Sequence, residues 1–484
     1  MEYSAHSPDS AFRSYQNDRI RHWDDLAVHS VWIKYPSEYY HRLISNIYRH
    51  IVPPGQRVIE LGCSRGDLLA ALQPSHGVGI DFSGEMIGQG RKKHPELHFI
   101  EADAHQINMD EKFNYVILSD LVNDLWDVQT VFQQIQQFTE PQSRIVINTY
   151  SRLWEAPLLV ARKMGLGRPT LFQNWLTIGD IRGLLSLSGL EMVRHWEEIL
   201  WPLPTPILAK LLNRYIAKIW PFKWFALMHF IIARPMRKDL KVDPQKVKVS
   251  VIVPARNEAG NIQKILQSVP EMGAGTEIIF VEGGSKDETY HVIEKEIGQC
   301  PQRNCRLLRQ SGTGKGDAVR LGFSHADGDI LMILDADLTV RPESLPRFFE
   351  VLVSRKGEFV NGVRLVYPME KEAMRLLNLA GNKFFSLAFS WLLGQPIKDT
   401  LCGTKVLWKK DYERIAANRS YFGEFDPFGD FDLLFGAVKL NLKIREVPVR
   451  YRDRTYGTTN IRRWSHGWLL LKMVVFASRR IKFV

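Results

Sequence analysis

The stretch RVIELGCSRGDLLAAL (residues 57–72) begins with a β-branched apolar run, passes through a turn with two glycines, and continues with apolar residues at helical spacing. A second stretch, VSVIVPARNEAGNIQKIL (residues 249–266), has the same order of features. A strand, a polar turn and a helix in this order open an α/β unit. The two stretches share nothing else, so the sequence predicts two different α/β domains and not a duplication.

The chain length fits this division. At one domain per roughly 100–200 residues, 484 residues make two or three domains. Between the two stretches lies a polar, charged segment that contains two prolines, which is typical of a linker. We expect residues 1–238 to form the first domain, residues 239–246 the linker, and residues 247–484 the second domain.

The charge of the chain is unevenly distributed. There are 64 Lys and Arg against 53 Asp and Glu, a net charge of +11. Residues 443–484 carry eleven basic and two acidic side chains, and residues 206–240 carry seven and one, so the remainder is slightly acidic. Both basic segments are rich in Trp, Leu and Ile, and the sequence has no nucleic-acid recognition motif. The charge therefore does not indicate a nucleic-acid partner.

The two basic segments have the composition of helices that lie in a membrane interface. In residues 206–224, Lys210, Arg214 and Lys218 recur every four residues along one helical face, and aliphatic residues and Trp cover the rest. Residues 464–484 repeat this combination. We interpret both segments as peripheral contacts with an anionic membrane surface. The alternative is a core helix whose basic edge is solvated.

Cysteine content and hydropathy indicate the compartment. Four cysteines are too few for a disulfide framework, which favours a reducing environment. The N-terminus is polar and predicts no signal peptide. No uninterrupted apolar run approaches the ~18–20 residues that span a bilayer. We expect a cytoplasmic protein, peripheral on the inner face of a membrane if it meets one.

Polar residues follow each of the first four predicted strands. Because the carboxyl ends of parallel strands meet at one edge of a sheet, these residues are expected to surround a ligand. Glycines in the first turn let a backbone approach that ligand closely. An acid about 20 residues after the first strand typically binds ribose hydroxyls, a position that Asp81 fills. The residues expected at this edge are Glu60, Gly62, Gly66, Asp81, Asp103 and Ser119.

This ordered set resembles class I S-adenosylmethionine-dependent methyltransferases over about residues 15–235. The resemblance implies a Rossmann-like sheet with S-adenosyl-L-methionine as cofactor. Glu60 and the glycine turn would hold the methionine part, Asp81 the ribose, and Asp103 would lie near the adenine. Ser64 stands where the family commonly has glycine.

The methyl acceptor is not readable from the sequence. A hydroxyl acceptor needs a base, and three residues near the strand ends are candidates that could equally be structural: His105, Asp120 and Asp124. An inactive methyltransferase half in a membrane-recruited scaffold is the alternative.

The second domain also places acids after predicted strands. PARNE (residues 254–258), VEGGSKDET (residues 281–289) and Asp335-Ala-Asp337 follow one another in this arrangement. Two carboxylates separated by one residue after an apolar strand can bind Mg²⁺ or Mn²⁺, which shares its ligand shell with substrate phosphates. The alternative for a lone pair of this kind is a solvated turn, and the two upstream motifs favour the metal.

This set resembles family 2 glycosyltransferases with the GT-A fold. The resemblance implies that Asp335 and Asp337 bind the metal. The family's usual Asp-Asp-Gly-Ser is here Glu-Gly-Gly-Ser (residues 282–285), so the base and the sugar of the donor stay open. The residues implied to contact a nucleotide-diphosphate sugar are Pro254, Arg256, Glu258, Glu282, Ser285, Lys315, Asp317 and Asp335.

Residues 398–415 and 429–463 narrow the resemblance to enzymes of the dolichol-phosphate mannose synthase type. It implies inverting transfer to a polyprenyl phosphate or another lipid-linked acceptor. Asn460 stands where that branch commonly has lysine, for which Arg462 or Arg463 could substitute. The residues implied to contact the acceptor phosphate are Arg454, Thr458 and Thr459.

The acceptor decides whether a catalytic base is needed. A lipid phosphate is already an anion at neutral pH, since its second pKa is about 6, and it should be surrounded by basic residues such as Arg454. A saccharide or small-molecule hydroxyl would need a general base, and Asp430 or Asp432 is then the candidate. The alternative role of both acids is to cap the apolar helix that follows.

Overall fold

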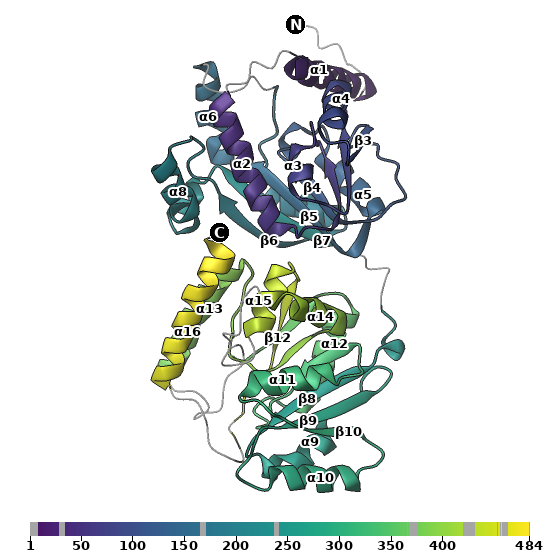
Figure 1. Cartoon of the computed structure of the whole chain (residues 1–484), viewed down its shortest axis with the longest axis vertical. Helices are drawn as coiled ribbons and strands as arrows, with labels where there is room; N and C mark the ends of the chain where they lie inside the picture. The colour runs from purple at the N-terminus through teal and green to yellow at the C-terminus, as the bar shows by residue number, and fades with distance from the viewer. Residues whose placement is uncertain are drawn as a thin grey trace. The chain divides into compact units, whose positions relative to one another are not determined.

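The computed structural model describes residues 8–28, 34–164, 171–236, 242–364, 366, 376–419, 431–452, 454, 456 and 463–483. The chain divides into two compact units, Met1–Arg237 and Lys238–Lys482 (Figure 1). Each unit is built on a seven-stranded sheet with helices on both faces, so the predicted α/β class is confirmed.

The sheet of the first unit has the order β3-β2-β1-β4-β5-β7-β6. Strands β3 through β5 of this order are parallel, and β7 runs antiparallel to both of its neighbours. The order reverses between β1 and β4, and open α/β sheets bind ligands at the carboxyl ends of strands at such a position. The strands are β1 (Arg57–Leu61), β2 (His76–Asp81), β3 (His98–Glu101), β4 (Phe113–Ser119), β5 (Thr139–Tyr150), β6 (Leu190–Glu198) and β7 (Met228–Pro235).

Alternate strand residues of this sheet enter two separate apolar clusters. Ile59 and Val116 belong to one cluster, and their neighbours Val58 and Ile117 belong to the other. Helices must therefore cover both faces, as in other parallel sheets. The helices are α1 (Pro8–Val28), α2 (Lys34–Ile51), α3 (Asp67–Ala71), α4 (Gly84–Lys93), α5 (Val128–Ile135), α6 (Glu155–Lys163), α7 (Ile178–Leu187) and α8 (Pro206–Arg214). The 3₁₀ turns used below are η3 (Arg152–Trp154), η4 (Ile216–Lys218) and η5 (Phe222–Phe225).

The second unit repeats this architecture with a different strand order, β10-β9-β8-β11-β13-β12-β14. Only β13 is antiparallel to its neighbours. Ile252 lies in one apolar cluster, and Val251 and Val253 lie in the other, so this sheet too is covered on both faces. The strands are β8 (Val249–Ala255), β9 (Thr276–Glu282), β10 (Asn304–Arg309), β11 (Ile330–Ile333), β12 (Phe359–Val363), β13 (Lys405–Trp408) and β14 (Ile444–Pro448).

The helices of the second unit surround this sheet, and α13 and α16 lie side by side (Figure 1). No helix in the described part of the chain is both long and apolar enough to cross a bilayer. The helices are α9 (Ile262–Ser268), α10 (Thr289–Gln299), α11 (Lys315–Ser324), α12 (Leu345–Val353), α13 (Leu376–Leu393), α14 (Lys409–Ala417), α15 (Phe431–Lys439) and α16 (Arg463–Ala477).

One detail of the predicted helix at residues 206–220 is wrong. The helix ends at Arg214, and Lys218 lies in η4, where it is buried and ion-paired with Glu198 at 3.1 Å. The cationic stripe is therefore limited to Lys210 and Arg214. A buried lysine needs such a partner because an unpaired charge is costly to remove from water.

Candidate active sites

The turn between β1 and α3 has the backbone conformation that its sequence predicts. Gly62 and Gly66 have φ values of +69° and +74°. At Gly66 a Cβ would also lie 2.6 Å from the ring of Phe99. Ser64, which replaces a common glycine, adopts a left-handed φ of +50°, and its N–H donates to Asp81 Oδ2 at 2.8 Å. This hydrogen bond ties the glycine turn to the end of β2.

Glu60 is buried at the carboxyl end of β1. Its Oε2 has no hydrogen-bond partner among the described residues, and burial raises the pKa of this carboxyl well above its usual range. A buried polar atom without a partner carries a free-energy penalty that a ligand donor can relieve. Glu60 and the positive-φ turn are the features that an ammonium-bearing cofactor at this edge requires.

Asp81 and Asp103 hold the loops that follow β2 and β3. The N–H of Ser83, which caps α4, donates to Asp81 Oδ1 at 2.9 Å, and burial raises the pKa of Asp81. Asp103 Oδ1 lies 2.5 Å from His105 Nδ1, and Gln16 of α1 donates to Oδ2. Burial opposes ionisation of Asp103, but the bonds to His105 outweigh it and lower its pKa. Helix α1 thus reaches the carboxyl edge of the sheet, which no local pattern predicted.

The three candidate bases differ in their surroundings. Both ring nitrogens of His105 are engaged, Nδ1 with Asp103 and Nε2 as acceptor from Asp127 N–H at 3.1 Å, so this ring has a structural role. Asp124 accepts from Gln173 at 3.2 Å and lies 3.8 Å from the guanidinium of Arg19.

Asp120 lies at the end of β4, beside Ser119, with a left-handed φ of +56°. It accepts hydrogen bonds from Tyr40 OH at 3.0 Å and from Asn148 Nδ2 at 2.6 Å. Burial and the nearby Asp120 charge raise the pKa of Tyr40 well above its usual range, so Tyr40 is a donor. Sequence reasoning missed Tyr40 and Asn148 because they come from α2 and β5, far along the chain.

In the second unit the loops after β8 and β9 are joined by hydrogen bonds. Asn257 N–H donates to Ser285 Oγ at 3.0 Å, and Lys286 N–H returns a bond to Asn257 Oδ1 at 2.7 Å. Glu282 is buried and its Oε1 accepts from Ser285 N–H at 2.5 Å. The acid of the Glu-Gly-Gly-Ser stretch therefore fixes its own turn. Pro254 lies within β8, and Arg256 is exposed just beyond it.

The Asp-Ala-Asp motif lies directly after β11, and each carboxylate faces a cation. Lys315 Nζ is 2.6 Å from Asp335 Oδ1, and Arg454 Nη2 is 2.6 Å from Asp337 Oδ2. Burial opposes ionisation of Asp335, but Lys315 and more distant cations outweigh it and lower its pKa. Asp317, two residues after Lys315, lies 3.9 Å from Arg320.

Arg454 brings together two groups that the sequence assigned to the donor. Besides Asp337, its guanidinium lies 3.8 Å from Glu258 Oε1, and burial raises the pKa of Glu258. The residue implied to contact the acceptor phosphate therefore lies against a carboxylate implied to bind the metal. Thr458, Thr459 and Asp430 lie outside the described residues.

Asp335 and Asp337 are the residues that would hold a divalent cation in the second unit. No group of three or more His, Cys, Asp or Glu side chains that could hold a metal occurs in the described part of the chain. Two carboxylates nevertheless fit Mg²⁺, which commonly takes one or two from the protein and completes its shell with water and substrate phosphates. Asp335 and Asp337, each balanced by a cation, are such a pair.

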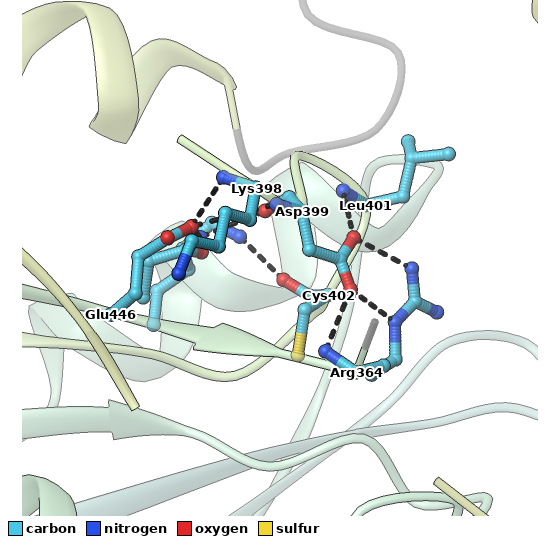
Figure 2. Close-up of polar contacts among 8 residues, drawn as sticks. Arg364, Lys398, Asp399, Leu401, Cys402 and Glu446 are labelled. Carbon is cyan, nitrogen blue, oxygen red and sulfur yellow. Dashed lines mark hydrogen bonds and ion pairs between the residues drawn. The ribbon is translucent and has the colours of Figure 1, made fainter. Parts of the chain in front are cut away.

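A buried ionic cluster lies near this motif, and sequence reasoning did not predict Arg364 or its pairing with Asp399 (Figure 2). Arg364 binds Asp399 through two side-chain bonds, Nε to Oδ2 at 2.7 Å and Nη2 to Oδ1 at 2.9 Å. Glu446 Oε1 accepts from Lys398 N–H at 2.6 Å. Arg364 outweighs the effect of burial and lowers the pKa of Asp399, whereas burial raises the pKa of Glu446. The cluster joins β12, the loop before β13, and β14.

Asp432 occupies the first turn of α15. Its Oδ2 lies 3.2 Å from Arg419 Nε, at the end of α14. This carboxylate oxygen is therefore paired with a cation in the structure. The two residues line a pocket together with Ile415, Asn418, Gly436, Lys439 and Leu440.

Comparison with known families gives two separate matches. The model described as glycosyl transferase family 2 matches residues 250–415, and a methyltransferase-domain model matches residues 53–177. Solved structures of S-adenosylmethionine-dependent methyltransferases also align with the chain. The one from Mesorhizobium loti is 21% identical, covers 39% of this chain and 96% of that chain, and has a TM-score of 0.31.

Curated relatives match less than half of the chain. Glycosyltransferase AglJ of Haloferax volcanii is 26% identical over 45% of this chain and 68% of its own length. A dolichyl-phosphate beta-glucosyltransferase of Trichomonas vaginalis is 28% identical over 44% of this chain and 68% of its own length. An undecaprenyl-phosphate 4-deoxy-4-formamido-L-arabinose transferase of Salmonella paratyphi B is 27% identical over 32% of this chain and 47% of its own length.

Proposed function

We propose that this chain, a transferase that combines a methyltransferase domain with a family 2 glycosyltransferase domain, is a bifunctional enzyme of glycolipid or surface-glycan biosynthesis. Its second unit transfers a sugar, with inversion, from a nucleotide-diphosphate sugar to a polyprenyl phosphate. Its first unit transfers a methyl group from S-adenosylmethionine. The names of two relatives, which act on dolichyl and undecaprenyl phosphates, support this acceptor class.

The observation that carries the acceptor assignment is the position of Arg454. Its guanidinium lies 2.6 Å from Asp337 and 3.8 Å from Glu258, so a phosphate bound by Arg454 would lie beside the donor diphosphate. A guanidinium binds phosphate oxygens through charge-assisted hydrogen bonds. An anionic acceptor of this kind attacks the anomeric carbon without a general base. Thr458 and Thr459 are proposed to complete the acceptor-phosphate site.

The donor site is proposed at the carboxyl ends of β8, β9 and β11. A divalent cation held there by Asp335 and Asp337 would offset charge on the diphosphate leaving group. Lys315 supplies a further positive charge beside Asp335. The remaining donor contacts are proposed for Pro254, Arg256, Glu258, Glu282, Ser285 and Asp317.

The first unit is proposed to bind S-adenosylmethionine at the carboxyl ends of β1, β2 and β4. Bound there, the cofactor supplies the methyl group. Buried Glu60 accepts from its ammonium group, the turn from Gly62 to Gly66 admits its methionine part, and Asp81 receives its ribose hydroxyls. Asp103 and Ser119 complete the set. We propose Asp120, oriented by Tyr40 and Asn148, as the group that takes the acceptor proton.

Exchange of Arg454 for glutamine tests the acceptor site. The full chain is given a panel of nucleotide-diphosphate sugars, Mn²⁺ and a polyprenyl phosphate, and glycosylated lipid is measured by mass spectrometry. Arg454→Gln should raise the KM for the lipid phosphate strongly. Arg452→Gln, exposed two residues earlier, is the matched control and should change it little. Equal effects of the two changes contradict the assignment.

The rival acceptor class predicts a different pattern. If the acceptor is a saccharide hydroxyl, Asp432→Asn should abolish turnover and polyprenyl phosphate should not be glycosylated.

A lipid acceptor also requires work at a membrane surface, so we propose that the chain acts peripherally at the cytoplasmic face. Within residues 464–484, Trp468 and Val475 of α16 are exposed, while Leu470 and Met473 are buried among core residues of the second unit.

A further inference from the structure

The segment between β6 and β7 carries the densest group of exposed large apolar side chains in the described part of the chain. We call residues 201–225 the apolar insertion. Ile207 is 86% exposed and Trp220 is 67% exposed, although both are large hydrophobic residues. The other exposed members are Leu203, Leu208, Leu211, Tyr215, Ile219, Phe222, Trp224 and Phe225.

Helix α8 of this insertion is oriented opposite to an ordinary surface helix. Its fully buried residues are Ala209 and Asn213, whereas Ile207 and Leu211 face outward. An amphipathic helix that serves only the protein core buries its apolar stripe and exposes its polar one. The orientation of α8 therefore contradicts the alternative of a core helix with a solvated basic edge.

Polar contacts on the inner side fix this orientation. Asn213 Oδ1 accepts from the N–H groups of Leu200 at 2.9 Å and Trp201 at 2.7 Å, and its Nδ2 donates to Trp201 O at 2.7 Å. The buried pair of Lys218 and Glu198 holds η4 in the same way. A side chain that satisfies three backbone groups cannot turn outward without leaving them unpaired. The exposed apolar face is thus built into the fold.

The chemistry of the exposed face fits an anionic bilayer. The insertion contains no Asp or Glu, and Lys210 and Arg214 are exposed among its apolar residues. Aliphatic and Trp side chains beside basic residues characterise surfaces that enter the headgroup region, and basic residues near an anionic leaflet strengthen this binding. Trp154 Nε1 donates to Phe225 O at 2.9 Å, which joins the insertion to η3 and α6. Exposed apolar residues continue there with Leu153, Leu159, Val160 and Met164.

The insertion stands at the same sheet edge as the proposed cofactor site. Met228, the first residue of β7, pairs with Tyr150 at the end of β5 and with Glu198 at the end of β6. Asp120 follows β4 at this edge. Tyr40, which donates to Asp120, also lies 3.4 Å from the sulfur of Met228. The apolar insertion therefore begins and ends beside the proposed methyl-transfer site.

We propose that the apolar insertion and α6 dock the methyltransferase unit on an anionic lipid surface, and that its methyl acceptor is a lipid-borne molecule presented from that surface. The docking step stands by itself, and the acceptor class rests on the proposed methyltransferase function. Figure 1 shows α8 projecting from the side of the sheet, as an interfacial helix requires.

Vesicle flotation of the full chain tests the docking surface. Vesicles contain either phosphatidylglycerol and phosphatidylcholine or phosphatidylcholine alone. The double change Ile207→Glu/Trp220→Glu should lower binding to the anionic vesicles by about tenfold or more. Leu187→Glu is the matched control, since Leu187 is 70% exposed but ends α7 at the opposite edge of the sheet, and it should change nothing. Unchanged flotation of the double variant overturns the proposal. This is also the result expected if another protein segment, and not a membrane, covers this face.

Two parallel measurements separate this inference from the proposed function. Adenosylmethionine binding is measured by calorimetry on the same samples. A chain that floats but binds no cofactor contradicts the methyltransferase function and supports docking, whereas a chain that binds the cofactor but does not float overturns the docking. Labelled methyl groups transferred in a membrane extract should enter the organic phase. Label found only in the aqueous phase overturns the lipid-borne acceptor.

Discussion

The buried pair of Arg364 and Asp399 gives a sharp stability prediction. Asp399 is 1% exposed, and its carboxylate accepts two bonds from the Arg364 side chain and one from Arg364 N–H at 3.1 Å. Removing one partner of such a pair leaves an uncompensated buried charge and costs about 3–5 kcal/mol. Asparagine keeps one acceptor oxygen, so Asp399→Asn should lower the free energy of unfolding of this unit by about 3 kcal/mol.

The assay must report on the second unit alone, because a two-unit chain does not unfold in one step. Hydrogen exchange of β12 and β14 peptides in rising urea gives this local free energy. Glu350→Gln is the control, since Glu350 and Lys356 form an exposed pair at 3.8 Å, and it should change stability by less than about 1 kcal/mol.

A double change distinguishes a buried charge from simple loss of packing. Arg364→Met/Asp399→Leu removes both charges together and should be far milder than Asp399→Asn. If Asp399→Asn is as mild as Glu350→Gln, or if the double change is the most damaging of the three, the reasoning is refuted.

Three further outcomes are expected. The pKa of Asp399 is lowered in the folded chain. The stabilisation from Asp399 should therefore be fully present above its unfolded pKa of about 3.9 and be lost as the pH falls through the lower folded pKa. If the difference in unfolding free energy between the unaltered chain and Asp399→Asn stays constant down to about pH 2, the reasoning is contradicted. Gly66→Ala should destabilise the first unit by about 2 kcal/mol because of its φ of +74°, whereas Gly88→Ala in α4, with open space around it, should be neutral or stabilising in thermal melts. Asp337→Asn should lower Mn²⁺-dependent donor turnover by about two orders of magnitude, and full activity would exclude Asp337 as a metal ligand.

The α/β class and the strand ends were predictable because their signals are local. Residues 57–72 and 249–266 each encode a strand, a turn and a helix within one short stretch, and the structure has β1, α3, β8 and α9 there. Asp103 lies two residues beyond the end of β3 at Glu101, in a turn where Gln106 N–H donates to Asp103 O at 3.0 Å.

The missed residues share a physical reason. Tyr40 and Asn148, which donate to Asp120, come from α2 and β5, and Arg364, which binds Asp399, directly follows β12. Only the folded sheet edge brings them together, so no spacing in the sequence announces them. The orientation of α8 could not be predicted either. The apolar pattern of a helix does not show which of its faces makes buried hydrogen bonds, as Asn213 does with Leu200 N–H.

The central claim, that the chain is a bifunctional enzyme of glycolipid biosynthesis, can be tested in a single reaction. The full chain is incubated with a nucleotide-diphosphate sugar panel, Mn²⁺, isotope-labelled S-adenosylmethionine and a polyprenyl phosphate in anionic vesicles, and the extracted lipid is analysed by mass spectrometry. We predict a lipid phosphate that gains one sugar and, on that sugar-lipid, a labelled methyl group. A lipid phosphate that gains no sugar, while the same chain glycosylates a water-soluble saccharide added in a parallel reaction, would contradict the account.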